Sequence, residues 1–194
     1  MKSSLNLLHN SSVTIYNHGF HNQICVSRST SRALLFHSHP SLGPQTNRQH
    51  PIYLHEILNG TDPTAVPVTA RSNYAGTNPL GAVFGAISIM DNPLRTSRDP
   101  NSILLGRAQG LYAMASQSEV VLFMSATYWF TAGSFNGSSF SLVGLNHAMK
   151  PLREIPIVGC TGRFRLAKGY CMVRTIAMDG SNNIIGYNGT LFHY

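Results

Sequence analysis

From residue 51 onward, short apolar segments alternate with turn sequences at roughly the 8–12-residue spacing that is typical of β-barrels and β-sandwiches. The apolar segments are residues 51–58, 65–71, 82–91, 106–115, 120–131, 138–145, 163–178 and 183–193. The turn sequences are Asn59-Gly60, Asp91-Asn92-Pro93, Asp99-Pro100, Asn136-Gly137 and Asp179-Gly180. No segment sustains a period of about 3.6 residues, so we expect helix only as short turns.

The longest segment, residues 163–178, predicts how such a strand places its side chains. Phe164 and Tyr170 would share one face with Leu166, while Cys171 and Val173 would share the other. Eight strands, several of them apolar on both faces, favour closure into a barrel, which leaves no open edge. We therefore predict an all-β fold, an eight-stranded antiparallel β-barrel with room for one small ligand. The second apolar faces predict that barrels also pack against each other.

The first 49 residues differ from the rest of the chain. They contain no Asp or Glu, and the first acidic residue is Glu56. We expect residues 1–49 to form a disordered or targeting extension and residues 50–194 to form the barrel domain. The apolar run Leu5 to Leu8 is too short for a standard secretory signal, so a transit peptide and a mispredicted first exon are the alternatives. No apolar run reaches the roughly 18 residues of a membrane span, so we expect no membrane partner.

The charge of the chain argues against a nucleic-acid partner. It has 14 Lys and Arg residues against 7 acidic residues, and only 11% of its residues are charged, compared with about 25% in an average domain. The basic residues are scattered, without zinc-finger spacing, an RNA-binding signature or a helix-turn-helix pattern. A basic surface suited to an acidic matrix is the simpler interpretation.

The sequence also lacks the signatures of cofactor, metal and covalent chemistry. It has no GxSxG elbow and no lysine of a phosphate-binding loop. Its three cysteines, Cys25, Cys160 and Cys171, form no CxxC pair, and its histidines cluster in the first 50 residues. We expect no cofactor, no metal site and no cysteine nucleophile.

Several polar residues on or beside the apolar segments are the candidate site. They are Glu56, Asp91, Tyr112, Asn146, Arg153 and Lys168. An acid, a phenol and an arginine that converge inside a barrel would suit an aromatic, phenolic substrate. A purely structural role for each of them is the competing interpretation.

Four N-x-S/T sequons occur, at Asn10, Asn59, Asn136 and Asn188. We expect glycosylation at the last three, which fall at predicted turns or strand ends. This favours a secreted protein, although no clear signal peptide is present.

Several motifs resemble those of plant dirigent proteins, in order and without gaps over about residues 51–194. They include YLHEIL at 53–58, GRAQGLYAMASQ at 106–117, REIPIVG at 153–159, TGRFRLAKGY at 161–170 and the terminal LFHY. The resemblance implies an eight-stranded antiparallel barrel related to allene oxide cyclase, which forms trimers and is secreted to the apoplast. A dimer is the alternative assembly.

The resemblance also implies a chemistry. Dirigent proteins of the best-known type have no oxidative activity; they hold phenoxy radicals made by a separate laccase or peroxidase, so that coupling gives one stereoisomer of a lignan. Other members dehydrate or cyclise isoflavonoid-type substrates through a quinone-methide-like intermediate.

Site residues carry over unevenly from the resemblance. Glu56, Tyr112 and Arg153 keep the acid, the first tyrosine and the arginine, and are the expected catalytic residues. Met114 stands in place of a second tyrosine and Asn146 in place of a second acid; with Asp91 they are the expected substrate-binding residues. The lost acid weakens a proton relay and the case for pinoresinol-type coupling. The pattern FRLAKGY at 164–170 resembles the broader branch linked to defence, terpenoid coupling and pterocarpan formation.

Three functional hypotheses follow. The first is a dirigent protein that sets the stereochemistry of phenolic coupling in phenylpropanoid metabolism, by orientation and confinement. The second is a lyase or dehydratase that acts on isoflavanol-type substrates. The third is a non-catalytic binder linked to defence or the cell wall.

Overall fold

The computed structural model describes residues 14–17, 51–71 and 73–193. The expected extension, residues 1–49, therefore lies outside the described residues, as does the Asn10 sequon, except for the short strand β1 (Thr14–Asn17). This strand pairs in parallel with residues 190–193 of the last strand. Within the described part of the chain, no helix is long and apolar enough to cross a membrane.

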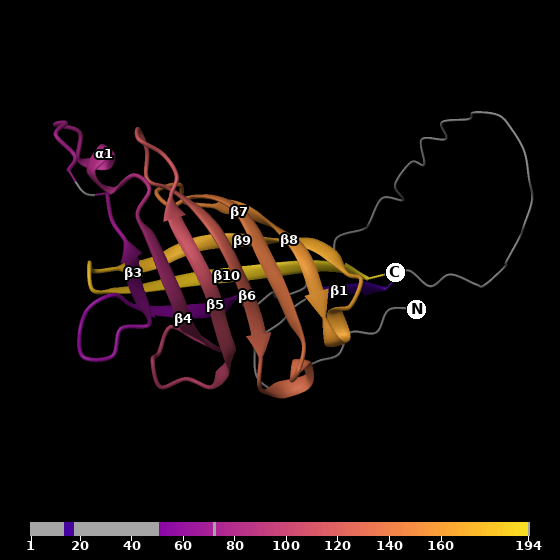
Figure 1. The fold of residues 1–194 in the computed structure, drawn as a ribbon. Coiled ribbons are helices and arrows are strands. Elements are labelled where there is room, and N and C mark those ends of the chain that lie inside the picture. The colour runs from indigo at the N-terminus through magenta and orange to yellow at the C-terminus, as the bar shows by residue number, and fades with distance from the viewer. Residues whose placement is uncertain (1–13, 18–50, 72, 194) are drawn as a thin grey trace, which may run out of the picture.

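Eight strands form a closed antiparallel barrel, which confirms the predicted fold (Figure 1). In order around the ring they are β2 (Ile52–Ile57), β4 (Ile87–Arg95), β5 (Leu104–Met114), β6 (Val121–Phe130), β7 (Ser139–His147), β8 (Arg153–Thr161), β9 (Lys168–Met178) and β10 (Asn182–His193). The ring closes because β10 pairs with β9 on one side and with β2 on the other. Each interior side chain is thus surrounded by side chains from other strands.

One strand position of the ring is shared by two segments. β2 pairs with residues 94 and 95 of β4, whereas β3 (Ala65–Thr69) pairs with residues 87–90 of the same strand. The loop between them contains Gly60, whose φ of 118° is in the region that favours glycine. The five-residue helix α1 (Pro79–Val83) follows β3 and stands at one end of the barrel in Figure 1. Asn78 caps it by accepting a hydrogen bond from the Leu80 N–H, so helix is confined to short turns, as predicted.

The predicted strand 163–178 is wrong over its first five residues. A 3-10 turn, η2 (Gly162–Phe164), precedes β9, and Leu166 has a φ of 66°. Gly162 has a φ of 61°, and a Cβ at this position would lie 2.7 Å from the Ser138 side chain. The turn breaks the alternation, so Phe164 is fully buried while Leu166 is 80% exposed.

Two further sequence predictions are corrected. Strand β8 was not predicted, because Pro156 and Gly159 lie within it and both usually interrupt strands. Conversely, the predicted turn Asp91-Asn92-Pro93 is wrong, because these residues lie inside β4. Pro93 has no N–H to donate to a neighbouring strand. It is tolerated there because the pairing of β4 with β2 ends at Leu94, the next residue.

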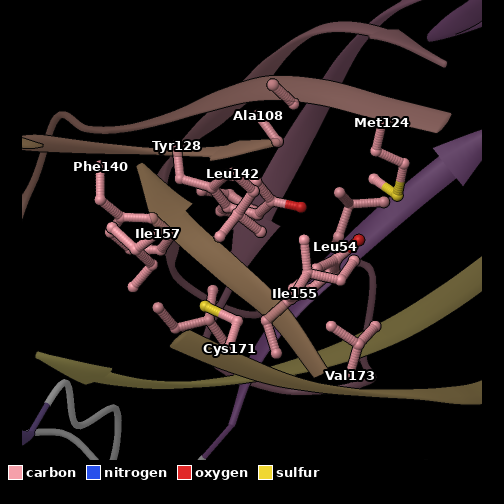
Figure 2. Close-up of a cluster of buried hydrophobic side chains, with 14 of the residues drawn as sticks. Leu54, Ala108, Met124, Tyr128, Phe140, Leu142, Ile155, Ile157, Cys171 and Val173 are labelled. Carbon is pink, nitrogen blue, oxygen red and sulfur yellow. The ribbon is translucent and has the colours of Figure 1, made fainter. Parts of the chain in front are cut away.

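Aromatic side chains fill part of the barrel interior. Tyr128 stacks on Phe140 with ring centroids 5.1 Å apart. Phe164 lies 4.9 Å from Phe135, which the 3-10 turn η1 (Gly133–Phe135) carries inward, and 5.9 Å from Phe130. Figure 2 shows how side chains from strands around the ring converge on this core. The aromatic side chains fill one part of the interior. The polar interior residues lie toward the end of the barrel that α1 occupies.

The outer face of the barrel is apolar over neighbouring strands. Val66 on β3 lies beside Ile89 on β4, and Phe123 on β6 lies beside Leu145 on β7. All four are exposed. This contiguous surface, the β3–β7 apolar face, matches the expectation that several strands are apolar on both sides.

Gly169 on β9 provides a test of how tightly the barrel is closed. A Cβ at this position would lie 1.8 Å from the backbone oxygen of Thr190 on β10. We expect Gly169→Ala to lower the free energy of unfolding by about 1–3 kcal/mol, because the strands must separate. Gly159→Ala is the matched control, since a Cβ there meets nothing within 4 Å. Urea unfolding followed by circular dichroism gives both values, and equal effects would contradict the close approach of β9 and β10.

Candidate functional site

The Glu56 carboxylate is the centre of the polar interior. Its side chain is 7% exposed. Asn183 on β10 donates from Nδ2 to Oε2 at 2.7 Å, and Asn92 on β4 donates from Nδ2 to Oε1 at 3.4 Å. Both contacts follow from the strand register, in which Asn183 lies directly beside Glu56 on the neighbouring strand. The two amide donors fix the orientation of the carboxylate, so the structure holds this buried acidic group in place.

Tyr112 on β5 lies against this carboxylate. Its hydroxyl interacts with the side chains of both Glu56 and Ser88, and Ser88 is its register partner on β4. Burial of the ring, followed by the negative charge of Glu56, raises the pKa of Tyr112 to about 12. The phenol therefore keeps its proton at neutral pH and can donate it in a hydrogen bond.

Arg153 enters the barrel from β8. It is 5% exposed, and it donates from Nε to Oδ1 of Asn146 and from Nη1 to the Lys150 carbonyl, both at 3.0 Å. Burial lowers the pKa of its guanidinium, while interaction with Tyr187 opposes that shift. Asn146 in turn donates to the Met124 sulfur at 3.3 Å. Asn146 thus positions the guanidinium without neutralising it.

The barrel therefore buries a negative and a positive group that are not paired with each other. Among the described residues, the ion pairs are Arg107–Asp91 and His147–Glu119, and neither involves Glu56 or Arg153. Burying charges without a counter-ion is costly unless another group compensates them. The arrangement is suited to a polar guest that hydrogen-bonds both charges.

The structure separates Asp91 from these residues. Its side chain is on the outer face of β4, where it is exposed and forms the ion pair with Arg107. Met114, by contrast, follows Tyr112 by two residues along β5, and its register partner is Leu122 on β6. Side chains two apart on a strand share a face, so Met114 is grouped with the interior residues and Asp91 is not.

The predicted glycosylation residues differ in accessibility. Asn59 and Asn136 lie in exposed turns. Asn188 lies inside β10 and is half-buried, and its side-chain oxygen is covered. Geometry therefore favours Asn59 and Asn136 as acceptors.

A shallow pocket of about 440 Å³ lies at the end of the barrel near α1. It is lined by Thr69, Ala70, Arg71, Phe84, Gly85 and Gln117. The Gly85 N–H donates to the Met114 carbonyl, so the pocket lies beside the end of β5.

Four interior residues were not singled out from the sequence. Asn92 was assigned to a turn and Asn183 follows one, so both were explained by turn chemistry. Tyr128 and Tyr187 lie in apolar strands, where an aromatic residue is expected in the core. Only the register between distant strands shows that they face Glu56 and Arg153, and a sequence pattern contains no such signal.

The described residues contain no group of three His, Cys, Asp or Glu that could hold a metal ion. Cys160 and Cys171 are not in a disulfide, and burial raises the pKa of both thiols, that of Cys171 to about 12. Protonated thiols are poor nucleophiles, so both are interpreted as packing residues.

Comparison with known proteins identifies the family. The family model of dirigent-like proteins matches residues 48–192. The chain belongs to the dirigent family. The resemblance seen in the sequence motifs is thereby confirmed.

Dirigent relatives cover most of the chain. Dirigent protein 23 of Arabidopsis thaliana is 43% identical over 150 residues, which are 76% of this chain and 78% of that protein. Pterocarpan synthase 1 of Glycyrrhiza echinata is 39% identical over 145 residues, 73% of this chain and 76% of that protein. The solved structure of the pterocarpan synthase dirigent protein PsPTS1 matches with a TM-score of 0.68 and 36% identity, over 74% of this chain and 93% of that one.

The position of Tyr112 in this dirigent barrel predicts a pH effect on stability. In the unfolded chain a tyrosine ionises with a pKa of about 10, whereas Tyr112 in the folded chain ionises at about 12. The folded form holds the Tyr112 proton more tightly than the unfolded chain does. The stabilisation from this proton should therefore be fully present below about pH 10 and be lost as the pH rises to about 12. We expect Tyr112→Phe to lose less stability over this range.

Urea unfolding at several pH values from 9 to 12 measures the difference. Tyr170→Phe, which removes a hydroxyl from the outer face of β9, controls for loss of a hydroxyl alone. A Tyr112→Phe variant with the full wild-type slope would contradict burial of this phenol beside Glu56.

Proposed function

We propose that this dirigent protein binds a phenoxy radical or a quinone methide inside its barrel and sets the stereochemistry of the bond formed from it. The observation that supports this most directly is the pair of buried, unpaired charges, Glu56 and Arg153, in one enclosed barrel. Phenolic substrates supply what these groups lack, a hydroxyl that donates to the carboxylate and an oxygen that accepts from the guanidinium.

Binding at two points would fix which face of the ring is open to attack. The carboxylate, held by Asn92 and Asn183, would accept from one hydroxyl of the substrate. Arg153, held by Asn146, would donate to an oxygen at the other end. The chain's contribution is orientation and confinement, while a separate laccase or peroxidase generates the radical.

The energetic requirement is modest. A tenfold preference for one enantiomer needs a difference of about 1.4 kcal/mol between the two barriers. A single hydrogen bond to a charged group contributes about 1.5–3 kcal/mol. One such contact, made in only one of two orientations, is enough.

Chiral chromatography of coupling products tests the proposal. With laccase and a monolignol or related phenol, we expect the wild-type chain to give an enantiomeric excess, and Glu56→Gln and Arg153→Gln to give nearly racemic product. The matched controls are Glu154→Gln and Arg174→Gln, which change exposed residues of β8 and β9. Racemic product from the wild-type chain for every phenol tried would overturn the proposal.

A second candidate is dehydration of an isoflavanol-type substrate, which the similarity to pterocarpan synthases and the contact between Glu56 and Tyr112 favour. The benzylic C–O bond breaks, and the leaving hydroxyl takes the Tyr112 proton and departs as water. Glu56 accepts the phenol proton of the substrate and returns it to Tyr112. One water is lost, a quinone methide forms, and no oxidant is needed.

Turnover without an oxidant distinguishes the two candidates. If the chain is a dehydratase, it should convert an isoflavanol in the absence of laccase, and Tyr112→Phe should lower kcat by about 10²–10⁴-fold, the usual contribution of a general acid. Liquid chromatography of the product measures this, with Tyr170→Phe as control. Unchanged turnover in Tyr112→Phe would contradict the role of the phenol.

We also propose that the protein is secreted to the apoplast and assembles with copies of itself through the β3–β7 apolar face. The exposed Asn59 and Asn136 sequons support the first proposal, and the exposed Val66, Ile89, Phe123 and Leu145 support the second. Unmodified asparagines in the native protein would contradict the first, and a monomeric mass by light scattering the second.

A further inference from the structure

Two tyrosine hydroxyls inside the barrel have no evident partner except each other. Tyr128 on β6 is 0% exposed and Tyr187 on β10 is 1% exposed. Their ring centroids lie 5.0 Å apart, with the planes tilted by 57°. Neither hydroxyl makes a hydrogen bond of ordinary geometry to another described residue. The two hydroxyls nevertheless interact with each other as a hydrogen-bonded pair, so the two oxygens lie close together.

A mutual hydrogen bond would not satisfy this pair. Two hydroxyls carry two hydrogens, and one bond between them uses one hydrogen. The other hydrogen would still have no acceptor among the described residues. Buried donors without an acceptor are rare and costly in proteins, so a group that is not part of the chain is the natural acceptor.

The pair is held rigidly and faces the polar interior. Phe140 stacks on the Tyr128 ring at 5.1 Å with an interplanar angle of 8°. Figure 2 shows the Tyr128 hydroxyl directed away from Phe140, toward the side of Leu54 and Met124. Met124 is the residue that contacts Asn146, the partner of Arg153.

Electrostatics place Tyr187 within range of both charges of the site. Its ionisation responds to Glu56 and to Arg153, and burial is the largest of the causes that raise its pKa and that of Tyr128. Both phenols are therefore neutral at physiological pH and act as hydrogen-bond donors. Glu56 affects both phenols through its charge and not through a hydrogen bond.

We propose that Tyr128 and Tyr187 form a donor site for an aromatic oxygen, namely the phenolate, phenoxyl or quinone-methide oxygen of the bound substrate. Buried, preoriented donors stabilise an oxygen that carries negative or partial negative charge far better than solvated donors do. The inference rests on the proposed function, which it deepens. Glu56 would accept from one end of the guest, and the tyrosine pair would donate to an oxygen elsewhere on it.

Two isosteric fluorescent probes test the site. 2-Naphthol carries one aromatic oxygen, and 2-methylnaphthalene has a methyl group in its place. We expect the Tyr128→Phe/Tyr187→Phe double variant to bind 2-naphthol about threefold to tenfold more weakly than the wild-type chain does, the range for a lost hydrogen bond. Its Kd for 2-methylnaphthalene should change less than about twofold, and Tyr170→Phe should leave both values unchanged.

The Tm provides a second measurement, because a structural role of the two hydroxyls would predict a change in the opposite direction. Because one hydroxyl hydrogen of the pair has no acceptor in the free protein, the double Phe variant should melt at the wild-type Tm or up to about 2–4 °C above it. A lower Tm would show that the hydroxyls have a structural partner and would overturn the inference. Equal weakening of both probes, or no binding of either probe to the wild-type chain, would overturn it too.

The outcomes separate this inference from the proposed function. If coupling is stereoselective and Glu56→Gln abolishes the selectivity, but the double variant binds 2-naphthol as the wild type does, only the tyrosine site is wrong. If coupling is racemic but the double variant loses 2-naphthol selectively, the oxygen site stands and the proposed function fails.

Discussion

The pairing of β10 with both β9 and β2 is the constraint on which the rest of the structure depends. It closes the sheet, so backbone N–H and C=O groups along the ring are paired and the interior is cut off from the sides. It also brings Asn183 beside Glu56, 127 residues away in sequence. Without closure, the carboxylate would be on an open sheet face, where water would solvate it.

Closure also divides the interior into two kinds of environment. Phe130, Phe135, Phe140 and Phe164 pack against one another and fill their part of the barrel with apolar surface. Glu56, Tyr112 and Arg153 occupy the remainder, each held by a neighbouring strand. Apolar walls lower the local dielectric, which strengthens every polar contact that a guest makes there. The aromatic core thus contributes to the chemistry of the site as well as to stability.

The polar groups of this dirigent barrel complement each other. Glu56 accepts, while Arg153 and Tyr112 donate, and the chain itself does not bring the two charges together. A site that neutralised its own charges would bind a phenol weakly, because the guest would have to displace an ion pair. Asn92, Asn183 and Asn146 instead orient the charged groups with neutral amides, so the charges stay available.

The sequence alone determined the class of fold and the candidate residues on it. The turn dipeptides Asn136-Gly137 and Asp179-Gly180 and the apolar segments between turns act locally, and local patterns are visible in one dimension. The same local reasoning gave wrong results at Pro93, at Pro156 and at residues 163–167, where partner strands and a 3-10 turn override the propensity of the residues. It also grouped Asp91 with Glu56, although the two side chains lie on opposite faces of the barrel wall.

Only the tertiary structure decided which polar residues meet. Whether a side chain points inward depends on register, and a shift of one residue reverses it; register is set by pairing between strands that are far apart in sequence. This is why Glu56, Asn92 and Asn183 form one cluster, and why Tyr128 and Tyr187 bring two hydroxyls together in the core. The sequence contains these residues, but their meeting is a property of the closed ring.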